Sequence, residues 1–305
     1  MKKIYRLLPT LHDNIWGGNK LREYGKISEK DRIAESWELS FVAGEEATVE
    51  EGVPVSAMFP KSTWGTNAEK FEFFPTLTKF IDAREKLSVQ VHPDDEYALR
   101  FEGQYGKSEM WYVVEAERGA GIYMGLSGEC DTEEFKRRTL DGTVEEVLSF
   151  VEVKPGDVYF IPAGTIHAIG EGVLIYEIQQ NSTLTYRLYD YMRKDKDGKQ
   201  RPLHVDAAMK VARLARYEHP TFEDGSEVIG RCKYFETSEC VIDGNREFTV
   251  GEESFLAFTC VKGEGTLEGE SVHVGDSFFA PASAGRISAA GTMTLITVTV
   301  PNINN

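Results

Sequence analysis

Residues 155–163 read PGDVYFIPA, and residues 274–282 repeat the same pattern as VGDSFFAPA. Each copy begins with a Gly-Asp turn, continues as a short apolar strand and ends at a turn marked by proline. Two segments upstream, 110–121 and 255–265, also correspond, because each is an apolar strand followed by Gly-x-Gly. An internal repeat of this kind predicts two related β-barrels in one chain.

The repeat also predicts how the 305 residues divide. We expect residues 1–195 to hold N-terminal elements and a first barrel, which begins near residue 35. Residues 196–229 are expected to form a linker with a helix, and residues 230–305 a second barrel. The basic, turn-rich segment 193–201 opens the link between the two.

Short apolar stretches dominate the chain, and many of them are separated by Gly or Pro, as strands are. They lie at 73–81, 87–92, 110–115, 157–161, 173–178, 254–261, 277–280 and 293–300. Helical patterns are few and lie at 93–101, 131–140, 143–150 and 204–217, the third opening with a capping box of Thr143 and Glu146. The fold is therefore predicted to be mainly β with a few short helices.

Four residues with metal-ligand chemistry point to a single site in the first barrel. Gln90 and His92 lie two apart in an alternating strand, so both side chains leave by the same face. Glu109 precedes an apolar strand, and His167 follows the proline-marked turn. Two imidazoles, a carboxylate and an amide oxygen suit a divalent ion such as zinc. The second half has Arg286 where the first has His167, so its barrel is expected to be metal-free.

Composition limits the classes of partner. The formal charge of −16 argues against nucleic acid and anionic membranes, because binding there depends on Lys and Arg neutralising phosphates. A few convergent cations could still bind a small phosphorylated molecule. The four cysteines show no CxxC spacing, and no apolar run has the length of a membrane span or a signal peptide. These features predict a cytoplasmic protein with reduced thiols.

The pattern Gly156-x5-Pro162-x-Gly164-x2-His167 matches the second cupin motif, although it lacks the asparagine that often follows the histidine by four positions. The usual first motif with HxH is replaced by SVQVHP at 88–93 and GKSEMWY at 106–112. Together these segments resemble type I phosphomannose isomerases in their short bacterial form, without a large helical insertion. IWGG at 15–18, ESWE at 35–38, YEIQQ at 176–180 and TYRLYD at 185–190 extend the resemblance over most of the chain. It implies a double-stranded β-helix, jelly-roll bicupin fold.

The resemblance also implies roles for individual residues. It makes Gln90, His92, Glu109 and His167 the ligands of one zinc ion per chain. It makes Arg187 catalytic and places Lys79, Ser88 and Lys107 around a phosphorylated sugar. Arg193 stands where some relatives have lysine, so a phosphate contact there would keep the charge and change its geometry.

The implied reaction belongs to carbohydrate metabolism and interconverts mannose 6-phosphate and fructose 6-phosphate. A proton moves between C2 and C1 through a cis-enediol, and zinc acts as a Lewis acid. Glu177, on the strand after His167, is a candidate base, with Lys107 and a water of the metal site as alternatives. Arg187 would fix a hydroxyl or stabilise the charged oxygen.

Two other functions fit the same scaffold. One is a sugar-phosphate-binding cupin that regulates without turnover, and the other is a non-haem iron oxygenase using two histidines and a carboxylate. Four protein ligands leave less room for dioxygen and substrate together, which favours the isomerase. The sequence leaves open the metal bound, the role of the second barrel, and whether the protein is a monomer or a small homo-oligomer.

Overall fold

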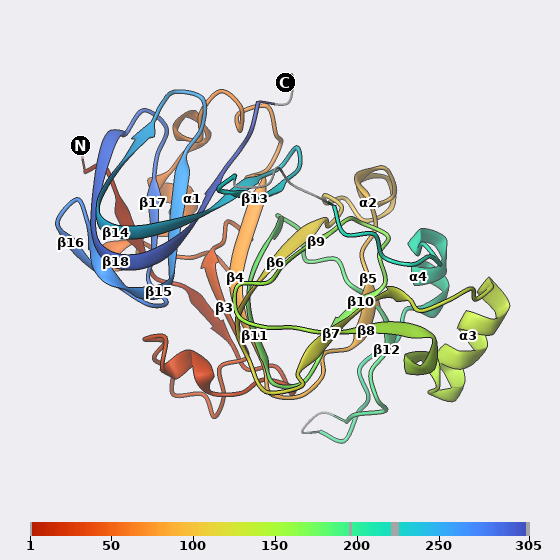
Figure 1. The fold of residues 1–305 in the computed structure, drawn as a ribbon. Helices are drawn as coiled ribbons and strands as arrows, with labels where there is room; N and C mark the ends of the chain where they lie inside the picture. The colour runs from red at the N-terminus through yellow and green to blue at the C-terminus, as the bar shows by residue number, and fades with distance from the viewer. Residues whose placement is uncertain (1, 195–196, 221–225, 303–305) are drawn as a thin grey trace.

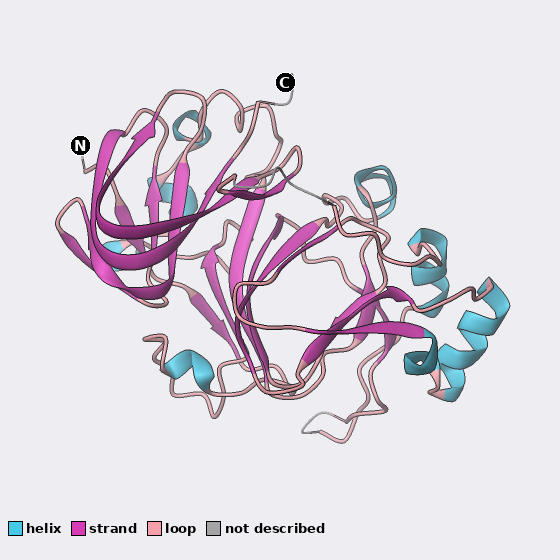
Figure 2. Ribbon diagram, in the orientation of Figure 1, coloured by secondary structure: helices cyan, strands magenta, loops and turns pink. Residues whose placement is uncertain are grey.

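Two β-barrels lie side by side in the structure, a computed structural model that describes residues 2–194, 197–220 and 226–302 (Figure 1). Strands make up most of both bodies, and short helices lie mainly at their edges (Figure 2). The mainly β prediction with two barrels is thus confirmed. Residue 196 and residues 221–225 of the predicted linker lie outside the described residues. No helix in the described part of the chain combines the length and apolar character needed to cross a bilayer.

The first barrel is built from two antiparallel sheets that share a core. One sheet has the order β2 (Thr10–His12), β3 (Glu35–Leu39), β4 (Thr76–Ala83), β11 (Val173–Gln180), β6 (Glu109–Ala116) and β9 (Val158–Ile161). The other has the order β12 (Tyr186–Tyr189), β5 (Val89–Val91), β10 (His167–Ile169), β7 (Gly121–Leu126) and β8 (Leu148–Glu152). Buried side chains from both sheets, such as Trp111 and Ile122, pack in one cluster.

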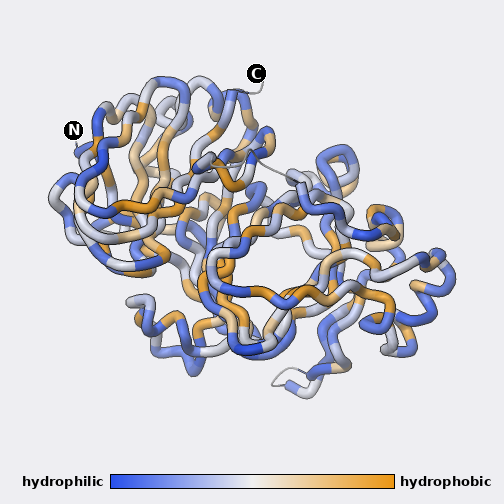
Figure 3. Tube along the Cα trace, in the orientation of Figure 1, coloured by the Kyte–Doolittle hydropathy of each residue, from blue (hydrophilic) through white to orange (hydrophobic). Residues whose placement is uncertain are grey.

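The second barrel is one sheet of long, bent strands. It consists of β1 (Tyr5–Leu7), β17 (Ser277–Ala280), β15 (Leu256–Leu267), β18 (Gly285–Thr299), β14 (Glu236–Val250) and β13 (Val228–Arg231), with β16 (Glu270–His273) paired to β15. The N-terminal strand β1 pairs with β17, so the start of the chain completes the sheet of the second barrel. Apolar residues recur along the strands of both barrels (Figure 3), and the buried ones pack into core clusters.

The helices confirm part of the sequence prediction and correct the rest. The described elements are η1 (Lys20–Arg22), η2 (Glu50–Gly52), α1 (Val55–Met58), η3 (Lys61–Thr63), α2 (Asp95–Phe101), α3 (Thr132–Asp141), η4 (Val144–Val147) and α4 (Val205–Val211). The helix predicted at 143–150 is wrong, since only η4 forms there and Leu148 already pairs in β8 with β7. The capping box is also absent, because Thr143 makes no side-chain cap.

The helix predicted at 204–217 is about twice as long as the observed helix α4, which has 7 residues. It ends at Val211, and the following residues run extended along the first barrel. Arg213 N donates to Gly164 O at 2.8 Å, and Leu126 N donates to Ala215 O at 2.9 Å. These hydrogen bonds to barrel edges compete with the helix for the same backbone groups, and tertiary context prevails over propensity.

Aromatic rings join the two barrels into one packed body. Phe74 of the first half lies 5.0 Å from Phe255 of the second, measured between ring centroids, and Phe255 lies 5.2 Å from Phe279. These side chains belong to the largest buried apolar cluster, which also contains Tyr176 of β11. Buried aromatic contacts of this size are strong contributors to packing, so the second barrel supports the sheet that holds β11.

Candidate active site

Strand register places three of the predicted site residues in one row of the five-stranded sheet. Arg187 of β12 pairs with Gln90 of β5, and Gln90 pairs with His167 of β10. Residues directly opposite each other in antiparallel strands point to the same face, and neighbouring strands lie about 4.8 Å apart. The three side chains therefore stand side by side on one face of this sheet.

The six-stranded sheet carries a second row. Glu177 of β11 pairs with Lys79 of β4 on one side and with Trp111 of β6 on the other. Glu109 lies two residues before Trp111 on β6, so it shares the same face. Trp37 of β3 pairs with Lys79 and extends the row.

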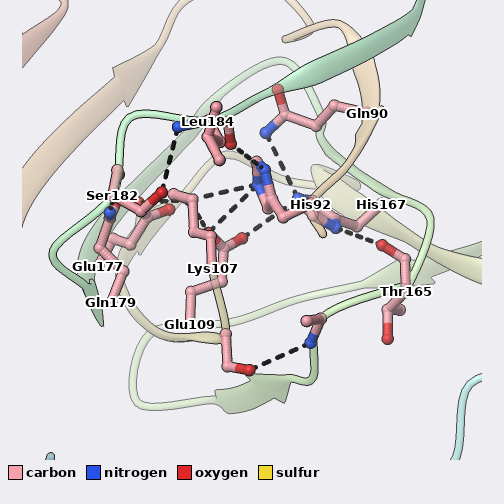
Figure 4. A network of polar contacts seen from close by, with 12 residues as sticks. Gln90, His92, Lys107, Glu109, Thr165, His167, Glu177, Gln179, Ser182 and Leu184 are labelled. Atoms are coloured by element: carbon pink, nitrogen blue, oxygen red, sulfur yellow. Dashed lines mark hydrogen bonds and ion pairs between the residues drawn. The ribbon is translucent and has the colours of Figure 1, made fainter. Parts of the chain in front are cut away.

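The rows meet around a buried cluster of His92, Glu109 and His167 (Figure 4). One candidate ligand atom from each residue lies within 4.8 Å of the others. The Nδ1–H of His92 donates to Leu184 O at 2.7 Å, and that of His167 donates to Thr165 O at 2.9 Å. A ring that carries its one proton on Nδ1 has a lone pair on Nε2, and the Nε2 of both rings faces Glu109.

The donor set fits a metal ion. The Nε2 of His167 lies 3.2 Å from Glu109 Oε1, and the Nε2 of His92 lies 3.5 Å from Glu109 Oε2. Glu109 Oε1 is buried and has no hydrogen-bond partner within the described residues. With neutral rings, His167 Nε2 and Glu109 Oε1 are two acceptors that face each other, and a cation between them would satisfy both. The Gln90 amide lies 3.4 Å from His167 Nε2 and, turned by half a rotation, offers its oxygen as a further ligand.

Lys107 supplies positive charge at this cluster in the structure. Its Nζ contacts the Glu109 carboxylate and lies 3.3 Å from His92 Nε2 and 3.4 Å from Glu177 Oε1. Burial raises the pKa of Glu109, but the charge of Lys107 outweighs it and holds that pKa well below its ordinary value. Burial, together with the charge of Lys107, lowers the pKa of His92 well below its ordinary value, which keeps the ring neutral.

Glu177 is a buried carboxylate held by three donors. Its Oε2 accepts a 2.7 Å hydrogen bond from Trp111 Nε1, and its Oε1 lies 3.2 Å from Lys79 Nζ and 3.4 Å from Lys107 Nζ. Lys79 is shared with Glu35, whose Oε2 is 3.3 Å away. Burial lowers the pKa of Lys79, but the two carboxylates reverse this effect and raise it above its ordinary value.

A cleft opens beside the cluster, and we call it the site cleft. Its walls include Trp16, Trp37, Lys79, Ser88, Arg187 and Arg201. Gln90, Lys107 and Glu177 reach the same cleft, so the structure brings together most of the residues predicted from sequence. Arg193 is the exception. Its Nη1 donates to Lys86 O at 2.6 Å and its Nη2 to Asp190 Oδ1 at 2.5 Å, which turns it away from the cleft lining.

Sequence reasoning gave no role to three residues of the cleft. Glu35 and Trp37 lie two apart in β3 and therefore share a face, which was the available signal in ESWE. Trp37 forms part of the cleft wall. Arg201 gave no signal, because its position depends on a loop that returns to β12.

The comparisons with known proteins agree with this geometry. Residues 4–118 match the family model "Phosphomannose isomerase type I, catalytic domain", and residues 227–300 match "Mannose-6-phosphate isomerase, cupin domain". The chain is 34% identical to the mannose-6-phosphate isomerase ManA of Bacillus subtilis over 300 residues, which is 93% of this chain and 94% of that protein. It is 39% identical to the mannose-6-phosphate isomerase of Streptococcus mutans over 220 residues, 70% of this chain and 69% of that protein.

A solved structure extends the similarity to three dimensions. The crystal structure of the mannose 6-phosphate isomerase from Bacillus subtilis superposes with a TM-score of 0.86 at 31% identity, covering 97% of this chain and 99% of that one. The bicupin fold expected from the motifs is confirmed by this match and by the cupin family model. The chain is an enzyme that belongs to the type I phosphomannose isomerase family.

Proposed function

We propose that this enzyme interconverts mannose 6-phosphate and fructose 6-phosphate with one zinc ion held by Gln90, His92, Glu109 and His167. The observation that carries the proposal is the convergence of two imidazole Nε2 atoms on the buried Glu109 carboxylate. This cluster adjoins a cleft that also contains Glu177 and Arg187. The relatives named above support the substrate pair.

Zinc, when bound, would act as a Lewis acid that favours negative charge on the sugar oxygens at C1 and C2. One carboxylate and three neutral ligands leave the ion a net positive charge. The backbone carbonyls of Leu184 and Thr165 fix the ring orientation of the two histidines, so the lone pairs are aimed before any ion arrives.

Glu177 is our candidate for the group that moves the proton between C2 and C1. Trp111 holds one of its oxygens, and the other faces Lys79 and Lys107. A carboxylate fixed on one side of a cis-enediol can remove a proton from one carbon and return it to the next. Lys107 lies within reach of Glu177 and Glu109. Its ammonium would stabilise developing negative charge, whereas its neutral amine would serve as the alternative base.

Arg187 would orient the sugar at the opposite wall of the cleft. Its row position beside Gln90 directs it to the same face as the metal ligands. A guanidinium keeps its charge at any working pH, so it can bind a hydroxyl or stabilise an oxyanion. Lys79 and Ser88 also line the cleft and are candidates for contacts with the phosphorylated sugar. Arg193, which donates to Lys86 O, is not part of the cleft lining.

We further propose that the enzyme works in the cytoplasm as a monomer or small homo-oligomer. All four cysteines are free thiols, and Cys240 and Cys260 are buried. Free buried thiols are typical of proteins in a reducing compartment.

The test is an assay of fructose 6-phosphate formation from mannose 6-phosphate, with metal content measured on the same samples. We expect turnover in the zinc-loaded protein, its loss on chelation and its return with zinc. His167→Ala and Arg187→Ala should each lower kcat/KM by at least about 100-fold. Saturable sugar-phosphate binding without turnover would favour the regulatory cupin, and iron with substrate-dependent oxygen uptake would favour the oxygenase.

A further inference from the structure

Asp190, directly after β12, holds two arginines of the following loop. Its Oδ2 accepts a 2.8 Å hydrogen bond from Arg201 Nε, and its Oδ1 accepts one of 2.6 Å from Arg201 Nη2. The same Oδ1 accepts a 2.5 Å hydrogen bond from Arg193 Nη2. The Asp190 side chain is only 5% exposed, so this fork fixes Arg201 against a buried anchor.

A third guanidinium stands next to this pair. Arg187 Nη1 donates to Pro202 O at 2.9 Å, which ties Arg187 to the residue after Arg201. Burial lowers the pKa of Arg187, and the positive charge of Arg201 lowers it further. Asp190 pairs with Arg193 and Arg201, and Glu85 Oε2 lies 3.8 Å from Arg193 Nη1. Three guanidinium groups therefore face two carboxylates, and the group carries an excess of positive charge.

The other cations of the site cleft are already neutralised. Lys79 lies between Glu35 and Glu177 at 3.3 and 3.2 Å. Lys107 contacts Glu109 and Glu177. An anionic part of the substrate would gain little from lysines that are paired with buried carboxylates.

Only two of the three arginines reach the site cleft. Arg187 and Arg201 line it, whereas Arg193 is directed to Lys86 O and Asp190. The Nε of Arg187 is buried without a hydrogen-bond partner in the part of the chain that the structure describes. An unpaired donor beside a second guanidinium, in a cleft with excess positive charge, is suited to a phosphate dianion.

We propose that Arg187 and Arg201 together bind the phosphoryl group of the substrate, and that Asp190 and Arg193 position Arg201 for this contact. The proposal rests on the proposed function and adds the residues that recognise the phosphate. Arg201 touches the phosphate directly. Asp190 acts through its fork to Arg201, and Arg193 acts through Asp190.

The experiment compares phosphorylated and unphosphorylated sugars in Arg201→Ala, Arg201→Lys and wild type. In Arg201→Ala we expect KM for mannose 6-phosphate and Ki for inorganic phosphate each to rise about 10- to 100-fold, from the loss of a charge-assisted contact. Turnover of mannose itself should change less than about twofold. Arg201→Lys keeps the positive charge but loses the two-pronged guanidinium contact. Its KM for mannose 6-phosphate and its Ki for inorganic phosphate should therefore lie between those of wild type and Arg201→Ala. Inorganic phosphate binding is also measured directly by calorimetry, so the result does not depend on mannose being turned over.

Arg137→Ala is the matched control, because it removes an exposed arginine on α3 whose side chain is 60% exposed. It should leave both constants unchanged. Arg193→Ala should raise Ki for inorganic phosphate less than Arg201→Ala does. A larger effect at Arg193 than at Arg201 would overturn the proposal, and so would an equal loss of mannose and mannose 6-phosphate turnover with unaltered phosphate binding. A wild-type enzyme that binds phosphate through Arg201 but does not isomerise would refute the proposed function alone.

Discussion

Tyr234 of the second half donates a 2.6 Å hydrogen bond from its hydroxyl to Asp95 Oδ2 on α2 of the first half. The other oxygen of Asp95 accepts hydrogen bonds from Gln180 Nε2 at 2.8 Å and Gly106 N at 3.0 Å. Gln180 Oε1 in turn accepts one from Ser108 N at 2.7 Å. Asp95 thus connects the second half to the segment of Lys107 and Glu109, where β6 begins.

The first prediction concerns Asp95→Asn. Burial raises the pKa of Asp95, but hydrogen bonds from Lys233, Tyr234 and Gln180 outweigh it and lower that pKa below its ordinary value. A depressed folded-state pKa stabilises the fold above the pKa of the unfolded chain, and this stabilisation disappears as the pH falls through the folded value. We expect Asp95→Asn to lower the free energy of unfolding at pH 7 by about 2 kcal/mol.

Urea unfolding of wild type and variant at several pH values checks this. The difference between the two should be largest near neutrality and should shrink below about pH 4, near the ordinary aspartate pKa. Glu96→Gln, at the next position of α2, is the control and should show a smaller effect. A difference that grows on acidification would contradict the assigned role of the Asp95 carboxylate.

The sequence predicted the candidate site residues better than it predicted how the strands and loops around them are paired. Alternation in the strand put Gln90 and His92 on one face, and the motif around His167 supplied the next candidate ligand. That Gln90 faces Arg187 and His167 is a matter of register between distant strands, which one sequence does not specify. Arg201 was missed for a related reason, since its place depends on a buried contact with Asp190.

In the fold, too, features with a local sequence signal were predicted, whereas pairings between distant segments were not. The repeat of the Gly-Asp turn predicted two barrels, and Figure 1 shows them. The pairing of β1 with β17 joins the N-terminal strand to the second barrel and has no local signal. At 143–150 the local capping signal was present, but pairing of Leu148 with Leu126 stabilised a strand instead.

The second prediction concerns the buried ion pair between the barrels. Lys26 Nζ lies 2.7 Å from Glu38 Oε1, and Ser277 Oγ of the second barrel donates to Glu38 Oε2 at 2.9 Å. Glu38→Gln leaves the Lys26 ammonium buried without its counter-charge, so we expect a loss of about 3–5 kcal/mol in the free energy of unfolding. Urea denaturation measures it, with exposed Glu264→Gln as the control. A loss no greater than that of the control would show that the pair is not needed.

The third prediction concerns the metal and stability. Because a metal binds the folded site and not the unfolded chain, free zinc at 100 times its Kd should stabilise the fold by about 2.7 kcal/mol. Thermal unfolding with and without a chelator should then differ by roughly 4 °C. His92→Ala should abolish both the shift and the bound metal. His273→Ala, whose side chain is 65% exposed, should retain both. If the protein contains metal and its melting temperature is unchanged when a chelator removes that metal, the proposed metal site would be contradicted.

The last prediction tests the close contact between the start of α2 and the loop before Lys107. A Cβ at Gly106 would lie 2.4 Å from the carbonyl carbon of Asp94 and 2.6 Å from the amide nitrogen of Asp95. Backbone atoms cannot move aside as easily as the end of a flexible side chain, so Gly106→Ala must displace the loop. We expect it to lower the free energy of unfolding by about 1–3 kcal/mol. Lys107 and Glu109 follow directly on this loop, so kcat should fall as well, even with zinc at saturation. Gly128→Ala meets no atom within 4 Å and should change stability by less than about 0.5 kcal/mol. Equal effects of the two substitutions on unfolding and on kcat would show that close backbone approach does not position these site residues.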